Sequence, residues 1–170
     1  MLLQALLLFA FPALAVLAAA RDATSYTIPN WISLALTGTF LAAGLACGLA
    51  PAAIGSHALV GVVALVIGMG MFAAGWLGGG DVKFFAATAL WLGWPLVTQL
   101  LLVTAVAGGL LTGLLLLLRS APVRARAAQG PAWVARLATP GESVPYGLAI
   151  AAGALLAFPG SPAPAAFLLG

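Results

Sequence analysis

Charge is scarce in this amino-acid sequence. Only 5% of its 170 residues are charged, whereas 64% are hydrophobic. An ordinary soluble domain carries about 25% charged residues. Six Lys and Arg stand against three Asp and Glu, which is too few basic residues for a nucleic-acid-binding surface. We therefore expect no nucleic-acid partner, and a protein surface that faces membrane lipids rather than water.

Cysteine is also nearly absent. Cys47 is the only cysteine and lies inside an apolar run, so the chain can form neither an internal disulfide nor a cysteine-based zinc site. We expect neither a metal ion nor a cofactor.

Long apolar runs are abundant instead. A bilayer core of about 30 Å takes about 20 helical residues to cross. The sequence predicts an all-α, polytopic membrane protein with one transmembrane domain over residues 1–170. Six spans are expected, at about 2–20, 31–49, 57–77, 82–93, 95–118 and 144–159. The fourth is short, and Pro95 argues for a break after it, so we expect its cytoplasmic end to lie below the membrane surface.

The charged residues indicate which way the spans face. All of them fall in the first, third or fifth connection: Arg21, Asp22, Asp81, Lys83, Arg119, Arg124, Arg126, Arg136 and Glu142. Six spans place these connections on one side, and Lys and Arg near span ends mark the cytoplasmic side. We therefore expect a cytoplasmic loop over 119–143 and both termini outside, in the periplasm. The first run lacks the basic start of a signal peptide, so we expect it to stay as a span.

Two acids lie at the cytoplasmic ends of predicted helices, Asp22 and Asp81. An ionisable side chain at membrane depth is costly and predicts a functional site. Two neighbouring carboxyl groups share one proton. The ionised group can deprotonate a water molecule while the protonated group donates to a peptide carbonyl. The pair therefore predicts direct hydrolysis of a peptide bond, without a covalent intermediate.

The helix ends suggest how the pair shares its proton. Asp81 opens the fourth helix at its positive end, whereas Asp22 lies at the negative end of the first. Lys83 would add positive charge if its ammonium group folds back. We expect Asp81 to be the more readily ionised member and Asp22 the proton holder, although the pair would titrate as a unit.

Three glycines, Gly78, Gly79 and Gly80, precede Asp81. Consecutive glycines lower helix propensity and permit positive φ angles. We expect them to form a loop without side chains that lets an extended substrate approach Asp81. Lys83 is either a second residue that shapes this site or an anchor at the cytoplasmic face.

Three motifs support a family resemblance. They are Gly78-x-Gly80-Asp81-x-Lys83, Asp22 followed six residues later by Ile28-Pro29-Asn30, and Val144-Pro145-Tyr146-Gly147 followed by Ala149-Ile150-Ala151. Together they resemble the type IV prepilin peptidases, which are intramembrane aspartic peptidases with a G-x-G-D motif. The short chain is most similar to the branch that processes Flp pilins of tight-adherence systems.

This resemblance implies an aspartic endopeptidase of the bacterial inner membrane, acting in pilus biogenesis and protein secretion. It would remove the short basic leader of prepilins at the cytoplasmic face, just after a glycine, with Asp22 and Asp81 as the catalytic aspartates. The implied partners are prepilins and membrane lipids. Longer family members carry a cytoplasmic domain with zinc-binding cysteine pairs, joined to methylation of the new N-terminus. This chain has no such cysteines, so no methyltransferase activity is expected.

Two other functions are compatible with the composition. A proton-coupled transporter could use the same acids as a relay, but beyond Asp81 the fourth and fifth spans offer only Thr and Gln side chains to continue it. A non-catalytic membrane scaffold would leave the two acids unexplained.

Other polar residues receive structural interpretations. We expect His57 at the outer end of the third span, far from the acids, and Asn30 as a helix N-cap. The segment 119–143 mixes Arg with Trp133, which is typical of a stretch on anionic headgroups. Within it Glu142 is a candidate to attract a basic leader.

Two glycine pairs, Gly44-x3-Gly48 and Gly109-x3-Gly113, suit close helix packing. This packing could serve the six-helix fold or a dimer, so the sequence leaves the oligomeric state open.

Overall fold

The structure is a computed structural model that describes residues 2–127 and 129–161, with the exception of the Pro95 side chain. The described residues form helices and no strand. The helices are α1 (Leu2–Ser25), α2 (Asn30–Ala46), α3 (Pro51–Ala73), α4 (Gly79–Leu118), α5 (Ala121–Ala127), α6 (Ala132–Leu137) and α7 (Tyr146–Ala157), with a 3-10 turn at Phe158–Gly160. The prediction of an all-α protein is confirmed.

Three segments in the described part of the chain are long and apolar enough to cross a membrane: Leu2–Ser25, Pro51–Ala73 and Leu96–Leu118. Two shorter apolar helices, Asn30–Ala46 and Tyr146–Gly160, accompany them. The prediction of a multi-pass membrane protein is thereby supported. Six crossings and the location of the termini outside stay predictions.

Helix α4 consists of two straight parts. Gly93 (φ 65°, ψ −171°) and Trp94 (φ −67°, ψ 151°) are not helical, so the chain turns between residues 79–92 and Leu96–Leu118. The expected break at Trp94-Pro95 is found one residue earlier, because glycine adopts the positive φ angle that the turn needs. The 79–92 part rises only about 20 Å at 1.5 Å per residue.

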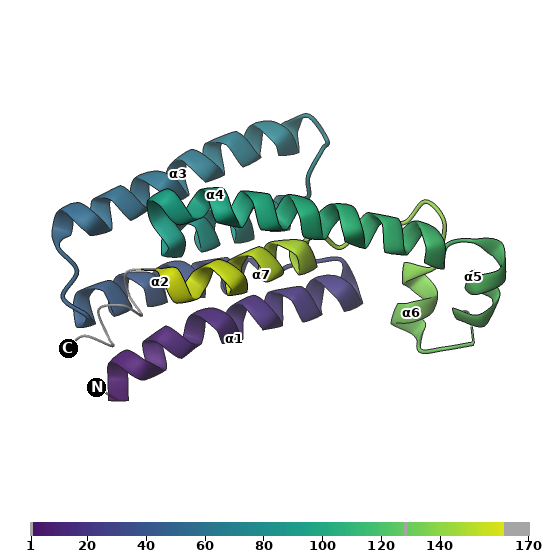
Figure 1. Ribbon diagram of the computed structural model, residues 1–170, viewed down its shortest axis with the longest axis horizontal. Coiled ribbons are helices and arrows are strands. Elements are labelled where there is room, and N and C mark those ends of the chain that lie inside the picture. Colours follow the sequence, from purple (N-terminus) through teal and green to yellow (C-terminus); the bar gives the residue numbers. More distant parts are fainter. Residues whose placement is uncertain (1, 128, 162–170) are drawn as a thin grey trace.

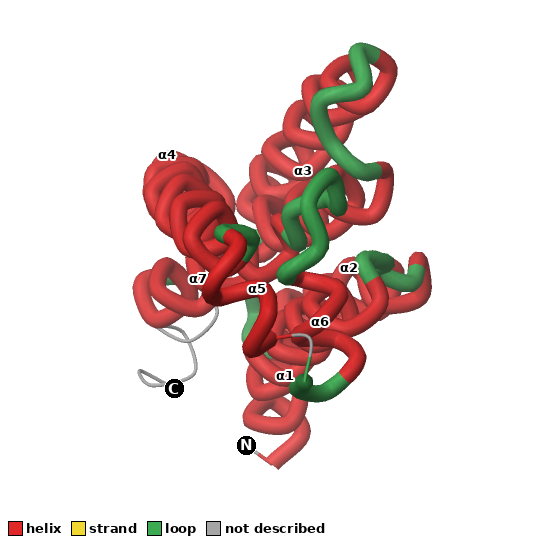
Figure 2. Tube along the Cα trace, turned by 90° about the vertical axis from the view of Figure 1, so that its right-hand side faces the viewer, coloured by secondary structure: helices red, strands yellow, loops and turns green. Residues whose placement is uncertain are grey.

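Neighbouring helices run in alternating directions (Figure 1). The side chain of Gln4 at the start of α1 donates to the carbonyl of Ala46 at the end of α2 (2.7 Å). Gln99, in the second part of α4, donates to Leu156 at the end of α7 (3.4 Å). The connections 26–29, 74–78 and 119–145 consequently share the end of the molecule that carries α5 and α6. Seen from that end, α3 extends away from α1 (Figure 2).

Glycines allow α3 to pack closely on the first part of α4. A Cβ at Gly68 would lie 2.6 Å from Val82, and one at Gly61 would lie 3.0 Å from Leu90. Both glycines are buried on α3. A side chain at either position would therefore push the two helices apart.

Three of the four glycines in the predicted pairs do not take part in close helix packing. Gly48 follows α2 in a turn with φ +70°, and none of Gly48, Gly109 and Gly113 has a neighbour within 4 Å of an added Cβ. The alternative that these three pack within the fold is wrong, because they lie outside helix contacts.

Several helix ends differ from the predicted spans. The third helix begins at Pro51 rather than at residue 57, because proline is tolerated in the first helical turn. It ends at Ala73, where Gly75 with φ +77° follows. The first helix continues to Ser25, so Asp22 lies inside its last turn and not after it.

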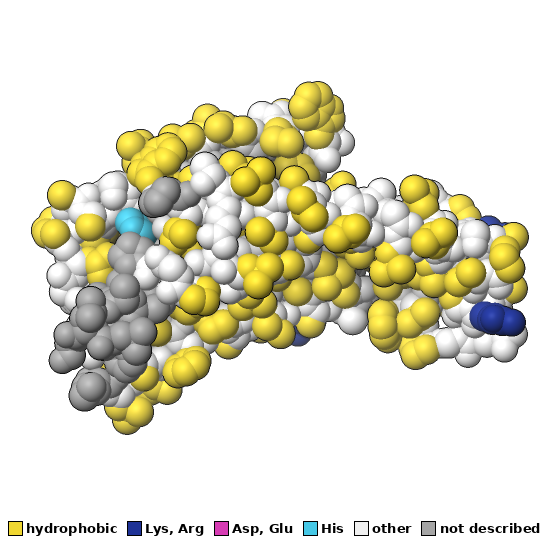
Figure 3. Space-filling model, in the orientation of Figure 1, with side chains coloured by type: hydrophobic (Ala, Val, Ile, Leu, Met, Phe, Trp, Pro, Cys, Tyr) yellow, Lys and Arg dark blue, Asp and Glu magenta, His cyan; other side chains and the backbone are white. Residues whose placement is uncertain are grey.

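The surface agrees with a membrane location. Apolar side chains, drawn yellow, cover the helical body on the face shown in Figure 3, and basic side chains are seen at the α5–α6 end. Large apolar residues such as Leu34, Leu102 and Leu110 are 68–71% exposed. Such an exposed apolar surface fits a hydrocarbon solvent better than water.

Candidate active site

The two predicted acids line one cavity, although they are far apart in the sequence. The cavity has a volume of about 390 Å³ and lies at the end of the bundle where α1 ends and α4 and α7 begin. Asp22 and Asp81 are close enough to interact electrostatically. The fold therefore brings together the pair that the sequence singled out.

Asp22 is held in place by the start of α7. Its carboxylate Oδ2 accepts a hydrogen bond of 2.7 Å from the backbone N–H of Gly147, and the residue is only 5% exposed. A Cβ at Gly147 would lie 2.8 Å from this oxygen and 2.8 Å from Ile28 Cδ1. Glycine is thus required at this position for α7 to reach Asp22.

Asp81 lies in the first turn of α4. Its Oδ1 is buried and has no hydrogen-bond partner among the described residues. A Cβ at Gly78 would lie 2.9 Å from its Oδ2. A buried polar oxygen without a partner costs about 1–3 kcal/mol, so Asp81 is poised to accept or donate a hydrogen bond to a molecule that enters the cavity.

Each acid faces a helix N-terminus, Asp81 that of α4 and Asp22 that of α7. The predicted difference in ionisation between the two acids considered only the helix on which each one lies. Because α7 also presents its positive end to Asp22, the helix ends do not indicate which of the two is the more readily ionised. The two carboxyl groups are best treated as one unit.

The glycine run is not the open loop that was expected. Gly78 precedes α4 with φ −72°, and Gly79 and Gly80 form its first turn. The run is needed for close approach, because a Cβ at Gly80 would lie 3.3 Å from the Cβ and carbonyl oxygen of Ile28. None of the three adopts the positive φ angle that glycine permits, whereas Gly75 in the preceding turn does (φ +77°).

Lys83 lies outside the cavity that holds the two acids, which leaves its interpretation as an anchor at the cytoplasmic face, and Asn30 does not cap a helix. Lys83 Nζ donates a 2.9 Å hydrogen bond to Asn30 Oδ1, and both residues line a different cavity, between α2, α3 and α4. Lys83 therefore does not fold back onto Asp81, because residues two apart on a helix do not share a face. Asn30 is the first residue of α2 and makes no capping hydrogen bond; Pro29 holds the N-cap position.

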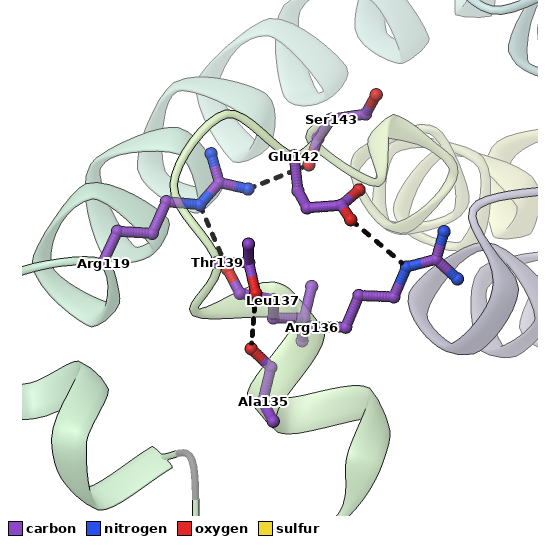
Figure 4. A network of polar contacts seen from close by, with 7 residues as sticks. All are labelled: Arg119, Ala135, Arg136, Leu137, Thr139, Glu142 and Ser143. Atoms are coloured by element: carbon purple, nitrogen blue, oxygen red, sulfur yellow. Dashed lines mark hydrogen bonds and ion pairs between the residues drawn. The ribbon is translucent and has the colours of Figure 1, made fainter.

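The connection between α4 and α7 contributes Ser143 to the cavity wall. Arg119 donates to the carbonyls of Leu137 (3.1 Å) and Ser143 (3.0 Å), as Figure 4 shows. Glu142 lies 3.7 Å from Arg136 Nε in an ion pair. Glu142 is thus already paired with a base and is not the free acid that was expected to attract a leader.

Tyr26 is a site residue that the sequence did not reveal. It lines the cavity, has a positive φ angle of 53°, and carries Arg136 over its ring at 4.8 Å. Its hydroxyl is buried without a partner among the described residues. A non-glycine residue with positive φ is uncommon, and such residues cluster at functional sites. The sequence alone could not indicate this role, because a single tyrosine in a short connection does not predict a positive φ angle. That angle is determined by the fold.

His57 is far from this cavity, as predicted. Its Nδ1 lies 2.8 Å from the carbonyl oxygen of Leu90, and its ring stacks on Phe40. It packs against Gly93, where α4 turns. The residue therefore stabilises the turn between the two parts of α4.

Fold and site together define a multi-pass helical membrane protein with two acids in one cavity. Residues 9–113 match the model of the type IV leader peptidase family, and this range contains both aspartates. The chain belongs to the type IV leader peptidase family, which is a family of peptidases. No curated protein and no solved structure gave a significant match.

Proposed function

We propose that the protein is an aspartic endopeptidase that removes the short basic leader of prepilins at the cytoplasmic face of the bacterial inner membrane. Asp22 and Asp81 are its catalytic residues. The observation that carries this proposal is their position in one cavity, where Gly147 orients Asp22 and Asp81 keeps an oxygen free of partners among the described residues. Membership of the leader peptidase family supports the same substrate class.

The reaction follows from a carboxyl pair that holds one proton. The ionised carboxylate takes a proton from water while the water oxygen attacks the carbonyl carbon of the scissile bond, and the protonated partner donates to the carbonyl oxygen. The tetrahedral intermediate then collapses: the carboxyl group that took the proton from water gives it to the leaving amine, and the other carboxylate takes a proton from a hydroxyl group of the intermediate, which becomes the carbonyl of the new carboxylic acid. The pair ends with one proton again, ready for another turnover.

The site lies where a leader can reach it. Asp22 and Asp81 are at the end of the bundle that carries the basic α5–α6 connection, and basic residues near span ends mark the cytoplasm. A prepilin can therefore keep its leader in the cytosol while its apolar helix remains in the membrane.

Co-expression with a candidate prepilin tests the proposal. The variants Asp22→Asn and Asp81→Asn should each leave the precursor uncut, because an amide can neither take up nor supply the shared proton. The Glu142→Gln variant is the matched control, since it makes the same chemical change in an acid outside the cavity, and it should cleave normally. Gel mobility and mass spectrometry of the product give the readout. Processing by either Asn variant would refute the assignment, and proton flux without processing would favour the transporter.

A further inference from the structure

A second cavity reaches Asp81 from the side of the membrane. It is a groove of about 500 Å³ between α3 and the Leu96–Leu118 part of α4, where Figure 1 shows α3 diverging from α4. Asp81 lines both this groove and the cavity that holds Asp22. The groove is thus continuous with the proposed catalytic pair.

The groove has the length and the chemistry of a site for a helix. On α3 it extends from Val60 to Met71, which is about 17 Å at 1.5 Å per residue. Asp81 is the one charged residue among those that line it. Ile67 and Leu101, on its two walls, are 61% and 52% exposed. An apolar helix lying here would run along the bundle, with one end at Asp81.

One unpaired polar atom distinguishes this groove from a resting place for lipid tails. Asp81 Oδ1 is buried and has no hydrogen-bond partner among the described residues, and Asp81 lines the groove. A hydrocarbon chain would leave this oxygen unsatisfied, which is costly for a buried polar atom. A peptide segment brings N–H groups that can pair with it where the segment unwinds near the scissile bond.

We propose that this groove between α3 and α4 holds the apolar transmembrane helix of the prepilin substrate, with the N-terminal end of that helix at Asp81. The inference rests on the proposed function and adds where the substrate lies and in which direction it runs. Its scissile bond then enters the Asp22–Asp81 cavity from the groove.

Disulfide cross-linking in membranes tests the position. The starting variant carries Cys47→Ala, which removes the one native cysteine, and Asp22→Asn, which keeps the substrate uncut. Ile67→Cys and, separately, Leu101→Cys place a thiol in the groove. Leu110→Cys is the control, because Leu110 is 71% exposed on α4 but does not line the groove. Each is co-expressed with a prepilin that has one cysteine in its apolar helix.

We expect both groove thiols to form a disulfide with the prepilin. The yield of this disulfide from Leu110→Cys should be at least tenfold lower. The direction is tested with Val63→Cys, because Val63 also lines the groove and is 38% exposed. This thiol should cross-link to substrate positions about four residues further from the junction than those that Ile67→Cys prefers. Cross-linking that is no stronger from the groove than from Leu110 would overturn the proposal, and the reverse order of positions would overturn the direction.

The proposed function is tested separately in the Cys47→Ala protein with Asp22 intact. If this protein cuts the prepilin while the groove thiols stay unlinked, the peptidase stands and the groove is not the substrate site. If the groove thiols link but no prepilin is ever cut, the groove binds the helix and the peptidase assignment fails.

Discussion

Gly147 lacks a side chain in the one place where Asp22 needs the space. The N–H of Gly147 holds Asp22 at 2.7 Å, and a Cβ would come within 2.9 Å of two Asp22 atoms. The residue therefore sets the position of a proposed catalytic oxygen without taking part in the chemistry. The sequence pattern contains this glycine, but only the fold explains it, because 125 positions separate the two residues.

The variant Gly147→Ala should lower the rate of leader cleavage about 100-fold, because a displacement of about 1 Å at a reacting group costs that much. Gly38→Ala is the matched control, since a Cβ at Gly38 meets nothing within 4 Å. Cleavage rates are compared at equal amounts of folded protein, measured by size-exclusion chromatography in detergent. Equal rates for the two variants would show that the N–H bond to Asp22 does not position it.

At the scale of helices, the turn inside α4 sets the depth of Asp81. Because the 79–92 part is shorter than a full span, its first turn, which contains Asp81, stops short of the membrane surface that a full-length span would reach. His57 supports the turn from α3 through the Leu90 carbonyl, and Trp91 supports it by donating a 2.7 Å hydrogen bond to the carbonyl of Leu36. Polar side chains in the apolar interior thus pair with the backbone near a break in a helix.

Replacing His57 should therefore affect stability more than chemistry. The variant His57→Ala leaves the Leu90 carbonyl without its partner and removes the stack on Phe40, so we expect a loss of about 1–3 kcal/mol and a lower Tm in detergent. Ser56→Ala is the control, because exposed Ser56 bonds only within its own helix. The folded fraction of His57→Ala should cleave at the normal rate; a normal Tm with lost cleavage would contradict this structural role.

The helices themselves could be predicted from apolar runs and breaks, whereas their mutual contacts could not. The apolar runs and Pro95 located a break in this part of the chain and placed both acids at helix ends. It could not show that Lys83 would reach Asn30, or that α7 would begin against Asp22, because such contacts depend on which helix ends meet in space. The sequence also did not predict that α3 would begin at Pro51, or that Gly80 would lie within a helix and allow it to pack closely against its neighbour.

Across the whole molecule, polar chemistry is concentrated at one end. The cavity with both acids, the Lys83–Asn30 hydrogen bond and the Arg119 network all lie at the end with the connections 26–29, 74–78 and 119–145. The opposite end has Cys47 and the Gly93 turn. This division matters for the proposed function, because a leader peptide and its basic residues would have to reach the acids without crossing the bilayer.

The division predicts which thiols a membrane-impermeant reagent can reach. Native Cys47 follows α2 at the end opposite the acids and is partly exposed, so it should be labelled by an impermeant maleimide in intact spheroplasts. In a Cys47→Ala background, a thiol from Ser120→Cys, on the α4–α5 connection, should be labelled only after the membrane is permeabilised. The opposite pattern would place both aspartates on the outer side of the membrane, where a cytosolic leader cannot meet them, and six alternating crossings with the termini outside would be excluded.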